Sequence, residues 1–162
     1  MLSRIVAVCA LLALAGTALA AQRPVPADLP ELLIERPWLD QVPKEKLQSL
    51  RAYFFIPERF EGAYAAIFLD ARDFRVTTEL LNFDVEGGKT IAFRVLSGGE
   101  KVKSSFVIQH EQHGEFDLVL KLGTDPGRRG SAQVYYSKTE WEDSRKVPSV
   151  LLPLLTRAGL PR

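Results

Sequence analysis

The feature that most constrains the fold of this chain is an alternation of apolar and polar residues between about residues 90 and 137. In GEFDLVLKLG (114–123), phenylalanine and leucine occupy every second position. Successive side chains of a β-strand point to opposite faces of the sheet, so this period predicts strands with one buried face. Four segments show it, with these residues predicted to face inward: Ile91, Phe93 and Val95; Val102, Ser104, Phe106 and Ile108; Phe116, Leu118, Leu120 and Leu122; Ala132, Val134 and Tyr136.

Turn residues separate these segments at intervals of roughly 10–13 residues, the spacing of a sandwich or barrel built from hairpins. They include two Gly-Gly pairs, at 87–88 and 98–99, and the sequence Asp125-Pro126-Gly127. Glycine accepts positive φ and proline presets a turn, so each predicts a chain reversal. The sequence therefore predicts a mainly β fold: an antiparallel sandwich or closed barrel of six to eight hairpin-linked strands.

Two further segments belong to the predicted sheet. The run AYAAIFLD (63–70) is apolar enough for a buried strand. Between 73 and 85 the alternation shifts register at Leu81, which predicts a bulge or a bent strand. A helix over TTELLNF (77–83) is the less favoured alternative.

A proline-rich arm, residues 21–42, precedes the β domain. Proline fixes φ and lacks a hydrogen-bond donor, so this arm is not expected to form a central strand or one long helix. ADLPELLIERPW (27–38) predicts one or two helical turns capped by Asp28, with its apolar residues packed against the domain. Those residues are Leu32, Leu33, Ile34 and Trp38.

Residues 43–138 are predicted as the β domain with a leading short helix. In VPKEKLQSLRAYF (42–54), Leu47, Leu50 and Phe54 stand at helical spacing behind a proline suited to a first turn. The last segment, 139–162, begins polar and ends in leucines separated by prolines. It is predicted to pack back on the domain, with a loose end as the alternative.

The first twenty residues predict a signal peptide rather than structure. Arg4 precedes an apolar run and an Ala18-x-Ala20 ending, the order of a secretory signal, and the run is short for a membrane span. A retained anchor is the alternative. Cleavage after Ala20 would remove the only cysteine, Cys9, which excludes disulfides and thiol chemistry in the mature chain. These features predict a periplasmic or secreted protein of a bacterial envelope, with no membrane span after cleavage.

The charge balance argues against a nucleic-acid partner. Without Arg4, 20 basic residues stand against 20 acidic ones. A neutral chain has no long-range attraction for nucleic acid or anionic lipid.

The segment IQHEQHGEF (108–116) carries both histidines of the chain. Two histidines three residues apart could reach one metal ion, with Glu111 and Glu115 as further ligands, but zinc would still lack a third histidine. The segment joins two predicted strands, so His110 and His113 are predicted to lie in a solvated hairpin connection. No metal and no cofactor are predicted.

Carboxylates and aromatic residues supply the remaining candidates. Asp70, Asp73 and Glu79 could form a hydrolytic pair, although acidic residues at strand ends more often solvate an edge. Tyr135 faces opposite to Tyr136, so one of the two is expected on the surface, where aromatic rings often anchor a partner. Trp141 is the second candidate contact, although its burial over the end of the domain is the favoured interpretation.

No complete catalytic set is visible in the sequence. The sequence therefore predicts an exported, non-enzymatic binding or accessory module that contacts a protein or glycan of the cell envelope. A carrier of a small apolar ligand with a barrel cavity is the alternative, and a hydrolase using the three carboxylates is the second alternative.

Overall fold

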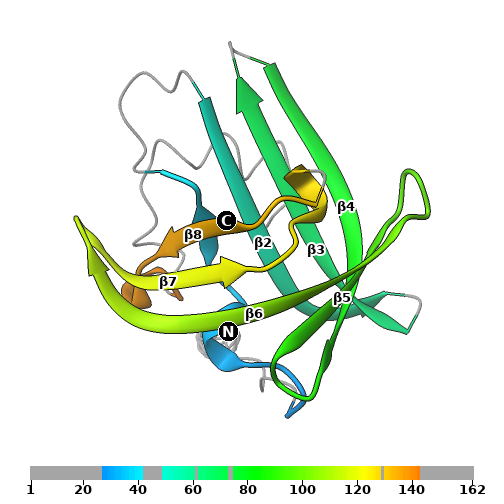
Figure 1. The fold of residues 1–162 in the computed structure, drawn as a ribbon, viewed down its shortest axis with the longest axis horizontal. Helices are drawn as coiled ribbons and strands as arrows, with labels where there is room; N and C mark the ends of the chain where they lie inside the picture. The colour runs from blue at the N-terminus through cyan, green and yellow to red at the C-terminus, as the bar shows by residue number, and fades with distance from the viewer. Residues whose placement is uncertain (1–26, 42–48, 61, 73–74, 129, 143–162) are drawn as a thin grey trace, which may run out of the picture.

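The computed structural model describes residues 27–41, 49–60, 62–72, 75–128 and 130–142. Eight strands form one closed antiparallel barrel, in which each strand pairs with the next along the chain and β1 pairs with β8 (Figure 1). The predicted fold class is confirmed, and of its two forms the barrel is the correct one. In chain order the strands and 3-10 helices (η) are η1 (Glu31–Leu33), β1 (Pro37–Leu39), β2 (Ser49–Phe60), β3 (Ala63–Arg72), β4 (Arg75–Glu86), β5 (Thr90–Val95), β6 (Lys101–His113), β7 (Phe116–Leu122), η2 (Pro126–Arg128), β8 (Gln133–Ser137) and η3 (Thr139–Glu142).

Aromatic side chains fill the barrel interior. The Tyr53 ring lies 4.8 Å from that of Phe68 and 5.6 Å from that of Phe55, which in turn meets Phe83 edge-on at 5.2 Å. The predicted inward faces of β5, β6 and most of β7 are confirmed, because their alternate residues join or pack against this core. The buried members from these strands are Ile91, Phe93, Val95, Phe106, Leu118, Leu120 and Leu122.

The segment before β1 closes one end of the barrel. Leu33 and Ile34 are buried in the core, and the Trp38 indole donates a hydrogen bond to the carbonyl of Leu33 at 2.9 Å. The predicted helical turn and its packing are confirmed. The predicted cap is wrong: Pro30 holds the N-cap position, and Asp28 instead accepts hydrogen bonds from Tyr64 and Arg59.

The loop between β7 and β8, which carries η2, closes the other end (Figure 1). The fully buried Asp125 accepts a 2.6 Å hydrogen bond from the Tyr53 hydroxyl and another from the Tyr135 hydroxyl. The backbone N–H of Gly127 donates to the same carboxylate at 2.9 Å. Three donors therefore satisfy the buried carboxyl group.

Two predictions for the segment before the β domain are wrong. The leading helix is contradicted over its second half, because residues 49–54 belong to β2, where Leu50 and Phe54 are buried on the outer face. Residues four apart lie on one face of a strand as well as on one face of a helix, so the spacing of Leu50 and Phe54 does not distinguish the two. The proline-rich arm also contributes a strand, β1, which lies between β2 and β8. Pro37 is its first residue, a position that tolerates proline.

The irregularity predicted near Leu81 is absent from the described pairing. β4 pairs with β3 without a shift from Tyr64↔Phe83 to Arg72↔Arg75. The apolar residues of β4 lie on both of its faces because each face meets an apolar cluster. Leu81 lies in the barrel interior, whereas Val76 packs against a second cluster on the outside of the barrel. Register shifts occur instead in β2, between Ile56 and Arg59, and in β6, between His110 and His113.

The predicted facing of β8 is inverted. Tyr135 and Ser137 are buried, whereas Val134 is 38% exposed and Tyr136 is half-buried on the outer side. A shift of one residue moves every side chain of a strand to the opposite face. The Tyr135 side chain can be buried in the core because its hydroxyl donates a hydrogen bond to Asp125.

A second apolar cluster lies on the outer face of β1, β2 and β3, beside Phe116 and Trp141. It explains the continuous apolar run at 63–70, since β3 is buried on both faces. Its strand residues are Leu39, Leu50, Ala52, Phe54, Ile67, Leu69 and Ala71.

Several predictions lie outside the described residues: the signal peptide at 1–20, residues 21–26 of the proline-rich arm, residues 42–48 and the tail from 143. In the part of the chain that the structure describes, no helix combines the length and hydropathy needed to cross a membrane.

Candidate binding site on the outer face of the barrel

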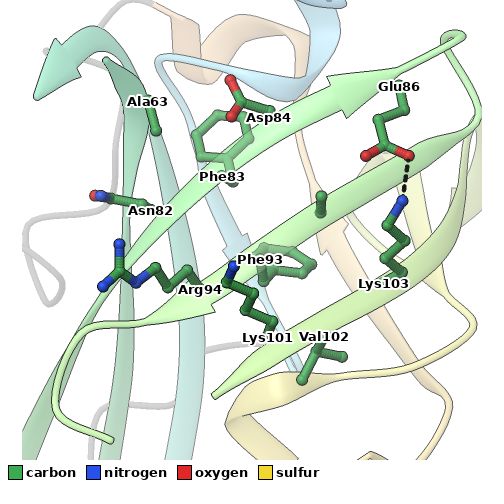
Figure 2. A pocket seen from close by; sticks show the side chains of 11 residues that line it. Ala63, Asn82, Phe83, Asp84, Glu86, Phe93, Arg94, Lys101, Val102 and Lys103 are labelled. Atoms are coloured by element: carbon green, nitrogen blue, oxygen red, sulfur yellow. Dashed lines mark hydrogen bonds and ion pairs between the residues drawn. The ribbon is translucent and has the colours of Figure 1, made fainter. Parts of the chain in front are cut away.

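A hollow of about 600 Å³ lies on the outer face of β4, β5 and β6, next to the start of β3 (Figure 2). Its size falls in the range of small-ligand sites, roughly 300–1,000 Å³. The outward side chains of three adjacent strands line it, because every second residue of a strand points away from the core. These side chains are Asn82, Asp84 and Glu86 from β4, Ala92 and Arg94 from β5, and Lys101 and Lys103 from β6.

The strand register arranges these side chains in two rows. In the first row Arg94 lies directly between Asn82 and Lys101, and in the second row Ala92 lies between Asp84 and Lys103. The methyl group of Ala92 leaves space between its two charged neighbours. The second row is therefore open at its centre, while the first row is filled by polar groups.

Charges in the hollow are only partly paired. Lys103 forms a 2.9 Å ion pair with Glu86, as Figure 2 shows, and Asp84 lies 3.8 Å from Arg59. The side chains of Arg94 and Lys101 have no ion-pair or hydrogen-bond partner among the described residues. Like charges directly opposite each other on neighbouring strands repel and destabilise the sheet. This pair of cations therefore opposes the stability of the barrel instead of supporting it.

Asn82 is the buried polar group of the site. Its side chain is 7% exposed, and its amide oxygen has no hydrogen-bond partner among the described residues. A buried acceptor without a donor costs about 1–3 kcal/mol. Asn82, Arg94 and Lys101 thus form a row of three polar groups whose interactions are incomplete.

The two histidines do not form a metal site in the described structure. β6 continues through His113, so the connection is shorter than predicted, and the His113 ring stacks on Tyr136 at 4.3 Å. Glu111 lies 3.2 Å from the amine of Lys121, and Glu115 lies 2.9 Å from that of Lys138. The described residues contain no group of three or more histidine, cysteine or acidic side chains placed to hold a metal.

The predicted carboxylates do not come together as a catalytic pair in the described part of the chain. Asp70 forms ion pairs with Arg51 at 3.1 Å and Arg72 at 2.7 Å. Burial acts to raise the pKa of Asp70, but these two arginines outweigh it and hold the pKa below its ordinary value. Glu79 accepts a hydrogen bond from Ser97, and Asp73 lies outside the described residues.

Neither predicted aromatic contact is on the surface. Tyr135 is 0% exposed in the interior, and Trp141 is 1% exposed in the outer cluster, edge-on to Phe116 at 5.7 Å. The expected exposure of Tyr135 is therefore wrong, whereas the burial favoured for Trp141 is confirmed. Both reach a core because each has a buried neighbour, Asp125 for Tyr135 and Phe116 for Trp141.

Sequence reasoning missed Asn82, Arg94 and Lys101 as a group. The alternation placed Ala92 and Arg94 on the polar face of their strand, but the register between strands was not available. Without the register, one asparagine and two cations that are separated in the sequence do not indicate a common site.

Comparison of the chain with protein-family models, with curated proteins and with solved structures finds no match. The candidate site therefore rests on its own geometry.

Proposed function

We propose that this protein is an exported, non-enzymatic binding module that holds a partner of the bacterial envelope in the hollow on β4, β5 and β6. The observation that carries the proposal is the adjacent pair Arg94 and Lys101, whose charges face the hollow without a partner among the described residues. Natural proteins tolerate such local costs chiefly at functional sites.

The packed interior supports a surface site over an internal one. Aromatic rings from β2, β3, β4 and β5 contact one another across the core. A carrier of an apolar ligand would need much of that space. No observation among the described residues favours the carrier or the hydrolase over the binding module.

The export part of the proposal rests on residues 1–20 and has its own test. The full chain, expressed in a bacterium with a general secretory pathway, should be recovered from the periplasm or medium with Ala21 as its first residue. Intact-mass measurement and N-terminal sequencing would establish this. A protein that keeps residues 1–20 would contradict export by cleavage.

Charge reversal tests the binding face. The double variant Arg94→Glu, Lys101→Glu should lose partners that are cross-linked to the wild type in its native envelope and identified by mass spectrometry. Arg75→Glu, which reverses a charge at the far end of β4, is the matched control and should keep them. Loss of the same partners in both variants, or in neither, would refute the assignment of the face.

A further inference from the structure

We infer that the hollow binds an acidic saccharide, with the carboxylate of a uronic acid residue between Arg94 and Lys101 and a hydroxyl of the same sugar donating to Asn82. This inference rests on the proposed function and names its ligand class.

The two cations define the first requirement of the ligand. Arg94 and Lys101 are paired residues of β5 and β6, and both are exposed to solvent on the outer face. An anion between them would replace a repulsion by two attractions, and charge-assisted hydrogen bonds are about twice as strong as neutral ones. The ligand therefore carries a negative group.

Asn82 defines the second requirement. Its buried amide oxygen is an acceptor without a donor in the described structure, and it lies directly across from Arg94. The ligand must supply an O–H or N–H close to its anionic group. Neighbouring strands lie about 4.8 Å apart, so the row from Asn82 to Lys101 spans about 10 Å. A sugar ring that bears a carboxylate and hydroxyl groups has both functions within this span.

The sheet itself favours a carboxylate over a phosphate. Phosphate sites typically use backbone N–H groups of glycine-rich loops or helix N-termini. The three strands under the hollow pair with one another through their backbones, in register on both sides of β5. Side chains alone therefore recognise the ligand.

The same sheet favours a saccharide over a peptide. Extended peptides commonly bind by adding a strand to a free sheet edge, whereas these strands belong to a closed barrel. The aromatic residues that lie under the hollow, Phe83 and Phe93, are at most 2% exposed. The second row of the hollow offers the charged groups of Asp84 and Lys103 to sugar hydroxyls.

Calorimetric titration with trigalacturonic acid tests the inference. The wild type should bind the free acid at least tenfold more tightly than the same trisaccharide with its carboxylates methyl-esterified, and binding should weaken as salt is added. Arg94→Gln and Lys101→Gln should each weaken binding about tenfold, and Asn82→Leu severalfold. Arg75→Gln should bind like the wild type. Thermal unfolding of each variant would verify that it remains folded.

Three results would overturn the inference: equal affinity for the acid and its methyl ester, wild-type affinity in the Arg94→Gln, Lys101→Gln double variant, or no binding of the trisaccharide. Tighter binding of a peptide with a free C-terminal carboxylate, or of inorganic phosphate, would also overturn the inference. The first result would indicate a peptide ligand and the second a phosphate ligand. If one of these overturning results is obtained while the charge-reversed double variant still loses its native partner in the cross-linking experiment, the saccharide is wrong and the binding face stands.

Discussion

At the scale of single residues, the buried carboxylate of Asp125 organises one end of the barrel. Burial raises the pKa of Tyr53 and of Tyr135 far above their ordinary value, and the negative charge of Asp125 raises both pKa values further. Both tyrosines therefore remain protonated and act as hydrogen-bond donors in the folded protein. The two hydroxyls and the N–H of Gly127 supply the carboxyl group of Asp125 with the hydrogen bonds that water would otherwise donate.

This arrangement predicts a particular response to alkali. In the unfolded chain Tyr53 and Tyr135 ionise near the ordinary pKa of 10.0, whereas in the folded protein they do not. Their contribution to stability is complete below pH 10 and is lost as the pH rises above it, because the unfolded state then releases protons that the folded state retains. Spectrophotometric titration should show these two tyrosines ionising only as the protein unfolds. Tyr53→Phe and Tyr135→Phe should each remove one such late-titrating group, and reversible ionisation of both in the folded barrel would contradict this account.

Gly127 is required for a different reason, close packing. A β-carbon at this position would lie 2.7 Å from a ring carbon of the buried Phe68. Overpacking of a core typically costs about 1–3 kcal/mol, so Gly127→Ala should lower the free energy of unfolding by that amount in urea denaturation. Gly123→Ala is the control: its β-carbon would meet the hydroxyl oxygen of Ser105, which can rotate away. Equal losses in the two variants would show that packing against Phe68 is not the cause.

At the scale of elements, the seam between the first and last strands is the weakest join in the barrel. β1 has three residues, and its only backbone pair with β8 among the described residues is Leu39↔Tyr136. Side chains supplement it: the buried Ser137 hydroxyl donates to the carbonyl of Pro37 at 2.7 Å, and Arg36 donates to the carbonyls of Lys138 and Thr139. Closure of the barrel thus depends more on hydrogen bonds from side chains than on backbone hydrogen bonds between β1 and β8.

Ser137→Ala should therefore open the seam. Loss of the hydroxyl leaves the carbonyl of Pro37 without this donor, at a cost of about 1–3 kcal/mol. Hydrogen exchange should accelerate at the amides of β1 and β8 and remain slow in β3 and β4, because the opening is local. Ser131→Ala, in the loop before β8, is an exposed serine control. Uniform acceleration throughout the barrel would contradict a local seam.

The elements also show how far sequence alone reaches. β5, β6 and β7 were predictable because one face of each meets water, which leaves the period of two visible at residues such as Arg94 and Lys121. β2 was mistaken for a helix because Leu50 and Phe54 are four residues apart, a spacing that places two residues on one face of either element. β8 was assigned the wrong face because Tyr135 is held inside by Asp125, ten residues earlier. The row of Asn82, Arg94 and Lys101 could not be predicted, because only the register between β4, β5 and β6 brings these residues side by side.

At the scale of the whole molecule, ion pairs and carboxylate hydrogen bonds join distant parts of the barrel. Burial acts to raise the pKa of Asp70 and of Asp117, but arginine partners at Asp70 and the backbone N–H of Thr139 at Asp117 outweigh it. Both folded-state pKa values lie below the ordinary 3.8.

The protein should consequently lose stability in acid. The contribution of these two carboxylates is complete above pH 4 and disappears as the pH falls through their folded pKa values, because the unfolded chain takes up protons first. Urea denaturation between pH 7 and pH 2.5 should show this fall. Asp70→Asn should be less stable than the wild type at pH 7, and its free energy of unfolding should fall less between pH 7 and pH 2.5. An equal fall in the two proteins would show that Asp70 does not contribute to the loss of stability in acid.

The pairing of β1 with β8 has a consequence for the order of events during synthesis. Leu39 can pair with Tyr136 only after Tyr136 has left the ribosome. Most of the polypeptide must therefore be synthesised before the barrel can close. Contacts this distant along a chain form slowly. If the chain is exported from its N-terminus, as proposed, the pairing of β1 with β8 can form only after the final strand has crossed the membrane.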